Sequence, residues 1–146
     1  MDSIRVPIIL DEGARLPEYK TRGSAGADLY ANIAETIRLM PLERRAVPTG
    51  LRMELPPGYE AQVRPRSGLA LEKGITCLNS PGTIDSDYRG EIKVILVNLG
   101  NAEARVEPGD RIAQLVIARY TEAAFEPEKA IGKSDRGDGG FGSTGT

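Results

Sequence analysis

The sequence predicts an all-β domain: a jelly-roll-like β-sandwich or distorted barrel with one short helix and a flexible glycine-rich C-terminal arm. Apolar and polar residues alternate with a period of two in several short runs, as they do in half-buried antiparallel strands. Turns containing glycine and proline separate these runs, and no long stretch shows helical periodicity. The 146 residues suffice for one domain with its own core.

The strands can be placed from this alternation. The run at residues 92–97 is apolar on both faces toward its end, which is typical of a central strand. The turns at residues 48–50 and 56–58 are expected to interrupt the sheet. The expected strands occupy residues 6–10, the end of 24–30, 36–39, 51–55, 59–64, 92–97, 104–106 and 111–118.

One short helix is expected at residues 67–73. Ser67 is its predicted N-cap, good helix formers follow, and Gly74 ends it. Free backbone N–H groups at such an N-terminus bind anions, and Arg64 and Arg66 directly precede it. The segment is therefore a candidate phosphate site. The alternative is an ordinary capped helix with surface arginines.

The stretch of residues 79–93 carries the most unusual side chains. It is expected to form a β-hairpin, with a turn at Pro81-Gly82 and a second strand that starts at Ile92. A tip that only joins strands needs turn residues, whereas this one surrounds Tyr88 with charge. The alternative is a solvated, charged hairpin. The charged residues are Asp85, Asp87, Arg89 and Glu91.

Two further features have a structural and a functional interpretation. Gln114 lies inside an apolar strand and needs a polar partner, so it is a structural amide or a ligand-binding group. Residues 133–146 are glycine-rich, which by composition alone predicts a mobile tail. The alternative, suggested by Phe141 among glycines with Arg136 upstream, is a lid that is mobile when empty and ordered over a ligand. We divide the chain into a β domain, residues 1–132, and a flexible C-terminal segment, residues 133–146, with tail and lid as its two interpretations.

The composition excludes several kinds of site. There is no histidine, which removes Ser-His triads, histidine metal cages and the zinc site of common base deaminases. Cys77 is the only cysteine, so no internal disulfide forms, and we expect it to be a buried small hydrophobe. Nineteen basic and 21 acidic residues argue against a nucleic-acid or membrane surface. Without a signal peptide or membrane-spanning run, we expect a cytoplasmic location, not distinguished from a nuclear or organellar one.

Five stretches resemble, in order, the motifs of the trimeric dUTP pyrophosphatase (dUTPase) family. A single glycine-rich string would be a weak signal, but five in order over most of the chain are highly specific. In the last motif Asp138 fills a variable position with a negative charge, which we expect to weaken phosphate affinity slightly. The stretches are residues 25–29 (AGADL), 64–70 (RPRSGLA), the hairpin 79–93, 109–115 (GDRIAQL) and 136–145 (RGDGGFGSTG).

The resemblance implies hydrolysis of dUTP to dUMP and pyrophosphate, with water attacking the alpha phosphate. It implies a homotrimer with shared active sites. Asp85 would be the general base, an economical choice in a chain without histidine. Mg²⁺ would be held mainly by triphosphate oxygens and waters, with Asp28 in its outer shell. Taken alone, Asp28 is more typical of a turn.

The resemblance also assigns substrate contacts. Tyr88 would lie against the sugar and exclude a 2′-hydroxyl, and Phe141 would stack over the base. Asn79 and the hairpin backbone would read the uracil edge. The implied substrate-binding residues are Arg66, Ser67, Gly68, Asn79, Gly82, Thr83, Ile84, Tyr88, Gln114, Arg136, Phe141, Gly142 and Ser143.

Three alternatives compete with this interpretation. A dCTP deaminase-like enzyme of the same fold places a glutamate inside the strand after the hairpin, where this chain has no acid beyond Glu91 and has Ile95 near the required position. A non-catalytic jelly-roll binding module would be favoured by loss of Asp85, Arg66 or the tail motif, and all three are present. An RNA-binding Arg-Gly tail is disfavoured, because a single such step beside two aspartates is poor material for it.

Overall fold

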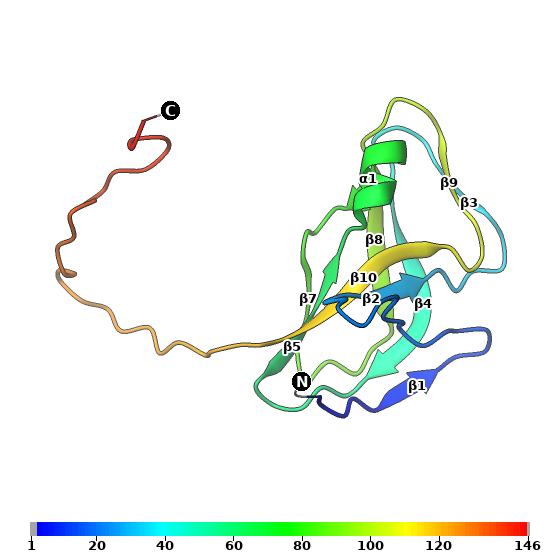
Figure 1. Ribbon diagram of the computed structural model, residues 1–146, viewed down its shortest axis with the longest axis horizontal. Helices are drawn as coiled ribbons and strands as arrows, with labels where there is room; N and C mark the ends of the chain where they lie inside the picture. The colour runs from blue at the N-terminus through cyan, green and yellow to red at the C-terminus, as the bar shows by residue number, and fades with distance from the viewer. Residues whose placement is uncertain (1–2, 146) are drawn as a thin grey trace.

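The computed structural model describes residues 3–145 and folds most of them into antiparallel β-sheets with one short helix (Figure 1). One four-stranded sheet has the order β1 (Ile8–Leu10), β4 (Arg44–Met53), β8 (Ile92–Asn98) and β6 (Ile75–Cys77). The other has the order β2 (Ala27–Tyr30), β10 (Arg111–Arg119), β5 (Tyr59–Arg64) and β7 (Gly82–Ile84). A two-stranded ladder joins β3 (Ile37–Leu39) to β9 (Ala104–Val106). The predicted all-β class with one helix is confirmed.

The hydrophobic core is built from the inward-facing residues of both four-stranded sheets. In β5, Ala61 and Val63 are buried whereas Arg64 is exposed, which is the period-two pattern that the sequence predicts. β8 lies between β4 and β6 and is buried along most of its length, so its predicted central position is confirmed. The fully buried aliphatic residues include Leu29, Leu39, Val47, Leu51, Val94 and Leu96.

The expected interruption at residues 48–50 is wrong, because β4 runs through it. The register of β4 against β8 shifts between Pro48 and Leu51, which is a β-bulge. The buried Thr49 hydroxyl donates a hydrogen bond to the Ile92 carbonyl at 2.6 Å. Gly50 takes a positive φ of 69°. The bulge therefore keeps the strand paired where a proline would otherwise end it.

The expected β-hairpin at residues 79–93 is also wrong, because its two arms belong to different sheets. β7 pairs with β5, whereas β8 pairs with β4 and β6. The stretch is therefore an arch that crosses from one sheet to the other, and we call it the arch. Ile84 and Ile92 at its two feet are buried in the shared core. Alternation along the chain indicates which face of a strand is buried but not which strand it pairs with.

The helix α1 covers Ser67–Lys73 and ends at Gly74, as predicted. The predicted N-cap is wrong: Arg66 is the N-cap residue, in an extended conformation and without a side-chain capping hydrogen bond. Gly74 has a φ of 67°, and a Cβ there would lie 2.5 Å from the Gly100 nitrogen. α1 is thus packed against the turn that follows β8, with the unpredicted strand β6 directly after it.

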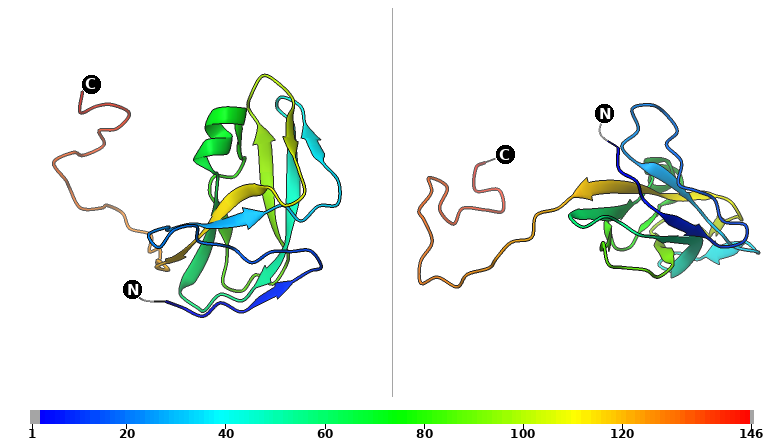
Figure 2. Two further views of the ribbon diagram at one scale, coloured as in Figure 1. Left: turned by 45° about the vertical axis from the view of Figure 1, so that its right-hand side comes forward. Right: turned by 90° about the horizontal axis from the view of Figure 1, so that it is seen from below.

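The chain beyond β10 contains no further strand or helix up to Gly145. It extends away from the sheets, as the orange-to-red segment of Figures 1 and 2 shows. Phe125, Ile131 and Phe141 are all exposed on it. Thr146 of the expected lid segment, and Met1 and Asp2 of the expected β domain, lie outside the described residues. No helix among residues 3–145 is long and apolar enough to cross a membrane.

Candidate active site

A cavity of about 400 Å³ opens beneath the arch, between β7 and β8. Six of the expected site residues line it, so the structure brings together the predicted general base, the predicted uracil-reading residues and the tyrosine. These residues are Asn79, Gly82, Thr83, Ile84, Asp85 and Tyr88. The remaining wall, which the sequence did not predict, comprises Ala46, Val63, Glu91, Ile92, Lys93 and Ile95. We call this cavity the arch pocket.

Asp85 directly follows β7 and stands exposed at the arch pocket. Its own peptide is held in a turn, because the Tyr88 backbone N–H donates to the Asp85 carbonyl at 3.2 Å. The carboxylate forms no ion pair within residues 3–145. It is thus an acceptor available to a water molecule in the pocket.

Glu91 is the second acid of the arch pocket, and its carboxylate is occupied. It accepts a hydrogen bond from the Gly50 backbone N–H at 3.1 Å and lies 3.8 Å from Lys93 Nζ. Only a fifth of the Glu91 side chain is exposed. The bulge of β4 therefore anchors Glu91, so the two pocket acids differ: Asp85 faces solvent and Glu91 is tied to the sheet.

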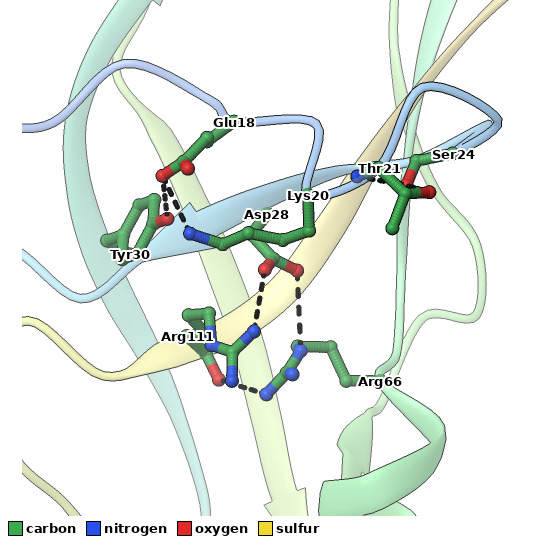
Figure 3. A network of polar contacts seen from close by, with 8 residues as sticks. All are labelled: Glu18, Lys20, Thr21, Ser24, Asp28, Tyr30, Arg66 and Arg111. Atoms are coloured by element: carbon green, nitrogen blue, oxygen red, sulfur yellow. Dashed lines mark hydrogen bonds and ion pairs between the residues drawn. The ribbon is translucent and has the colours of Figure 1, made fainter.

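Asp28 is the centre of a second cluster, which we call the Asp28 cluster (Figure 3). The residue is 9% exposed and lies in β2, so it is not a turn acid. Arg66 Nε is 3.4 Å from Asp28 Oδ1, and Arg111 Nη1 is 3.2 Å from Asp28 Oδ2. Arg66 also donates to the Arg111 carbonyl at 3.2 Å. Two guanidinium groups share one carboxylate, which leaves a local positive excess suited to an anion.

A neighbouring pair of charges does not cancel that excess. Lys20 Nζ lies 2.7 Å from Glu18 Oε2, and the Tyr30 hydroxyl donates to the same oxygen at 2.7 Å (Figure 3). The hydrogen bond with Lys20 is the main cause that lowers the pKa of Glu18, and it raises the pKa of Lys20 in return. Glu18 is therefore neutralised locally, and its charge does not compete for Arg66 or Arg111.

Gln114 joins three of the sequence motifs. Its Nε2 donates to the Pro65 carbonyl at 3.0 Å, and in β10 it stands opposite Asp28 on one side and Arg64 on the other. Gly26 permits this arrangement, because a Cβ there would lie 2.4 Å from Gln114 Oε1. The amide nitrogen is thus structurally satisfied and holds the segment that leads to Arg66. Contact between Gln114 and phosphate stays a prediction.

The expected tail residues lie apart from both sites within this chain (Figure 2). Arg136 Nε donates to the Gly139 carbonyl at 2.7 Å, which is a local turn. Phe141 is fully exposed with a positive φ of 50°. The structure therefore places Asn79, residues 82–85 and Tyr88 in one pocket and Asp28, Arg66 and Gln114 in another group. It does not bring Arg136, Phe141, Gly142 and Ser143 to either.

The side chains of this chain fit magnesium only where the ion arrives already bound to substrate phosphates. Within residues 3–145 no group of three or more Asp, Glu, His or Cys side chains converges on one point. The Asp28 carboxylate already faces two guanidinium groups. Since magnesium keeps several waters and often binds substrate phosphates, a contact with Asp28 through water remains compatible with this arrangement.

Comparison with known proteins agrees with this architecture. The family model described as dUTPase matches residues 12–145. This chain belongs to the dUTPase family. It is 62% identical over 136 residues to the deoxyuridine 5′-triphosphate nucleotidohydrolase of Treponema denticola, covering 93% of this chain and 94% of that protein. It is 53% identical to the protein of the same name from Fusobacterium nucleatum over 99% of both chains.

A solved structure of a family member shares the fold. A Staphylococcus bacteriophage 80alpha dUTPase, solved as a G164S mutant with dUpNHpp, superposes with a TM-score of 0.89 at 25% identity, over 99% of this chain and all of the other.

Sequence reasoning missed Arg111 in the Asp28 cluster and Glu91 in the arch pocket. Arg111 lies inside a recognised motif, so the motif was a signal for it. The role of Glu91 depends on the bulge of β4, which the sequence does not reveal.

Proposed function

We propose that this chain hydrolyses dUTP to dUMP and pyrophosphate. The observation that carries the proposal is the arch pocket, in which Asp85, a carboxylate that forms no ion pair within the described residues, stands beside Asn79 and Tyr88. Relatives 53–62% identical to this chain carry the name deoxyuridine 5′-triphosphate nucleotidohydrolase. Ile95 lines the pocket near where the dCTP deaminase alternative requires an acid, which disfavours that reaction.

In the proposed reaction, Asp85 takes a proton from a water molecule whose oxygen attacks the alpha phosphorus. The new bond joins that oxygen to the alpha phosphorus. The bond from the alpha phosphorus to the oxygen that bridges it to the beta phosphorus breaks, and pyrophosphate leaves with that electron pair. Removal of the proton by a positioned carboxylate is general-base catalysis. Asp85 suits this role better than Glu91, because the Glu91 carboxylate is held by Gly50 and Lys93.

We assign binding of the triphosphate to the Asp28 cluster and to the two residues that follow Arg66. Arg66, Ser67 and Gly68 would bind phosphate oxygens, with Gln114 holding the approach to Arg66. Mg²⁺ bound to the triphosphate would offset part of its negative charge. Asp28 would contact that ion through water and, by pairing with two guanidinium groups, orient Arg66.

We further propose a homotrimer with shared sites, in which the tail of one subunit closes the pocket of another. Phe141 lies 21 residues beyond Tyr120, the first residue after β10. At about 3.3–3.6 Å per residue an extended segment of this length spans roughly 70 Å, which exceeds the size of a domain this small. Within its own chain the tail approaches neither the arch pocket nor the Asp28 cluster, which supports delivery to a neighbour.

The activity is tested by incubating the purified protein and Mg²⁺ with each deoxynucleoside triphosphate and with UTP, then identifying every product. We expect dUMP and pyrophosphate from dUTP, and slow turnover of the others. Deamination of dCTP would instead establish the rival enzyme. Absence of any turnover would favour a non-catalytic binding module.

Shared sites are tested by complementation between two inactive variants. One is Asp85→Asn with an intact tail, and the other is a chain truncated after Gly132. Refolded trimers of one Asp85→Asn chain and two truncated chains should regain about one working site in three, because cyclic symmetry passes the single intact tail to one intact arch. If mixed trimers form and no ratio restores activity, the arch and the tail of a site come from one chain.

A further inference from the structure

The ring of Tyr88 lies directly over Gly90. A Cβ added to Gly90 would stand 2.4 Å from Tyr88 Oη, 2.6 Å from Cζ and 2.9 Å from Cε2. Real Cβ atoms do not approach other atoms this closely, so any other residue at position 90 displaces the ring. Gly90 does not have a positive φ. The requirement for glycine therefore comes from the tyrosine ring and not from the backbone.

A second contact fixes the far end of the ring. The Tyr88 hydroxyl donates to the Glu91 carbonyl at 2.9 Å. The bulge of β4 bonds to groups on either side of this carbonyl, the Glu91 side chain and the Ile92 carbonyl. Gly50 N–H donates to the Glu91 carboxylate at 3.1 Å, and the buried Thr49 hydroxyl donates to the Ile92 carbonyl at 2.6 Å. The ring is thus seated on a peptide that the core sheet itself anchors.

Within residues 3–145 the Tyr88 hydroxyl forms no other hydrogen bond. Tyr88 is 46% exposed, and the tip residues Asp87 and Arg89 on either side of it are exposed as well. Exposed side chains change rotamer on the picosecond-to-nanosecond timescale unless a contact restrains them. A ring that excludes a hydroxyl group by its bulk must occupy a constant position. The bare surface of Gly90 and the Glu91 carbonyl supply that constraint.

We propose that Gly90 is a specificity-determining positioning residue, which seats Tyr88 so that the arch pocket rejects ribonucleotides. The proposal rests on the proposed dUTP hydrolysis and deepens it. Gly90 is not among the residues that line the arch pocket, and it acts only through Tyr88. The bulge at Thr49-Gly50 contributes indirectly, because its hydrogen bonds to the Glu91 carboxylate and the Ile92 carbonyl anchor the residues around the carbonyl that the tyrosine hydroxyl binds.

The test is a double-mutant cycle between Gly90→Ala and Tyr88→Ala, read as the ratio of kcat/KM for UTP to that for dUTP. Gly90→Ala alone should raise this ratio about tenfold, the lower end of the change that a methylene-sized difference in a pocket produces. In the Tyr88→Ala background the same change should add nothing, because no ring remains to displace. An additional rise in that background, or an unchanged ratio in folded Gly90→Ala, would overturn the proposal.

Two further variants distinguish displacement of the Tyr88 ring from a nonspecific effect of substitution. Gly23→Ala is the matched control, since a Cβ at Gly23 meets nothing within 4 Å and the residue lies outside the arch. It should leave the ratio unchanged. Tyr88→Phe keeps the ring over Gly90 and removes only the bond to Glu91, so its ratio should fall between wild type and Gly90→Ala. A ratio in Tyr88→Phe as large as that in Tyr88→Ala would show that the hydroxyl, not Gly90, seats the ring.

A measurement that does not depend on activity tests the seating of Tyr88 by Gly90 separately from the proposed dUTP hydrolysis. In protein labelled with ring-¹³C tyrosine, the Tyr88 NMR signal is assigned by its loss in Tyr88→Ala. It should move toward the position of free tyrosine in Gly90→Ala and stay in place in Gly23→Ala. If the wild type fails to hydrolyse dUTP, the proposed function is wrong, and this shift still decides whether Gly90 seats Tyr88. An unmoved signal in Gly90→Ala refutes the seating itself.

Discussion

The arch pocket and the Asp28 cluster differ in which property of their side chains dominates. In the arch pocket, shape and one exposed carboxylate dominate: Asp85 has no ion-pair partner within residues 3–145, and Tyr88 is seated by a glycine and a carbonyl. In the Asp28 cluster, charge dominates, because two guanidinium groups converge on one nearly buried carboxylate.

The difference indicates a division of labour. A base must be accessible and must not be neutralised by a fixed cation, which describes Asp85. An anion-binding group must be held in place before its ligand arrives, which describes Arg66 and Arg111 beside Asp28. Phosphate contacts do not distinguish dUTP from UTP, so the proposed function assigns discrimination to the arch. The following changes probe this division, in order of decreasing effect.

Asp85→Asn should have the largest effect. It should lower kcat for dUTP by about 10²–10⁴-fold, the typical contribution of general-base catalysis, while the fold and the affinity for dUTP stay close to wild type. Steady-state kinetics and calorimetric titration measure the two quantities. Asp87→Asn is the matched control, because this exposed neighbour does not line the arch pocket. Turnover at the wild-type rate in folded Asp85→Asn would show that another group is the base.

Arg66→Ala should act on affinity more than on chemistry. A hydrogen bond to a charged group is worth about 1.5–3 kcal/mol, so Kd for dUTP should rise about ten- to hundredfold. Affinities for dUTP and UTP should fall by similar factors, because the Asp28 cluster binds what the two share. Arg52→Ala, which breaks an exposed ion pair with Asp11, serves as the control and should change affinity little. A selective loss of dUTP alone would contradict the division.

Tyr88→Ala should affect discrimination while leaving the phosphate contacts intact. We expect kcat/KM for UTP relative to dUTP to rise about tenfold, with a smaller fall in dUTP affinity. Competition between the two nucleotides in one reaction measures the ratio directly. An unchanged ratio would mean that the ring does not occupy the space of the 2′-hydroxyl.

The smallest expected effect lies in the scaffold that supports the arch. Cys77 ends β6 two residues before Asn79, and burial raises the pKa of its thiol from 9.0 to about 11. Because the folded protein favours the protonated thiol, this contribution to stability is complete below pH 9 and is lost as the pH rises toward 11. Between pH 8 and pH 10 the free energy of unfolding should fall by about 1 kcal/mol more in wild type than in Cys77→Ala. Equal pH dependence of urea unfolding in the two proteins would contradict the shift.

Much of the site was accessible from the sequence because the chemistry is concentrated in short local motifs. Asp85, Asn79 and Tyr88 lie within ten residues of one another, so a local pattern brings them together whatever the sheet pairing. The meeting of Asp28 with Arg66 and Arg111 spans 83 residues of sequence. Only the family resemblance connected those stretches, and the arginine pair on Asp28 did not follow from it.

By itself, the sequence determined which residue faces are buried, where the helix ends and which residue types are present for catalysis. These properties are local: alternation sets the buried face, a glycine accepts a left-handed φ, and the lack of histidine leaves a carboxylate as the natural base. The tertiary structure alone decided that the arms of the arch join different sheets and that β4 continues through Pro48 by a bulge. It also decided that the N-cap residue of α1 is Arg66 and not Ser67. Strand pairing and bulges depend on contacts between distant residues, which are selected by the energy of the whole core rather than by any short stretch.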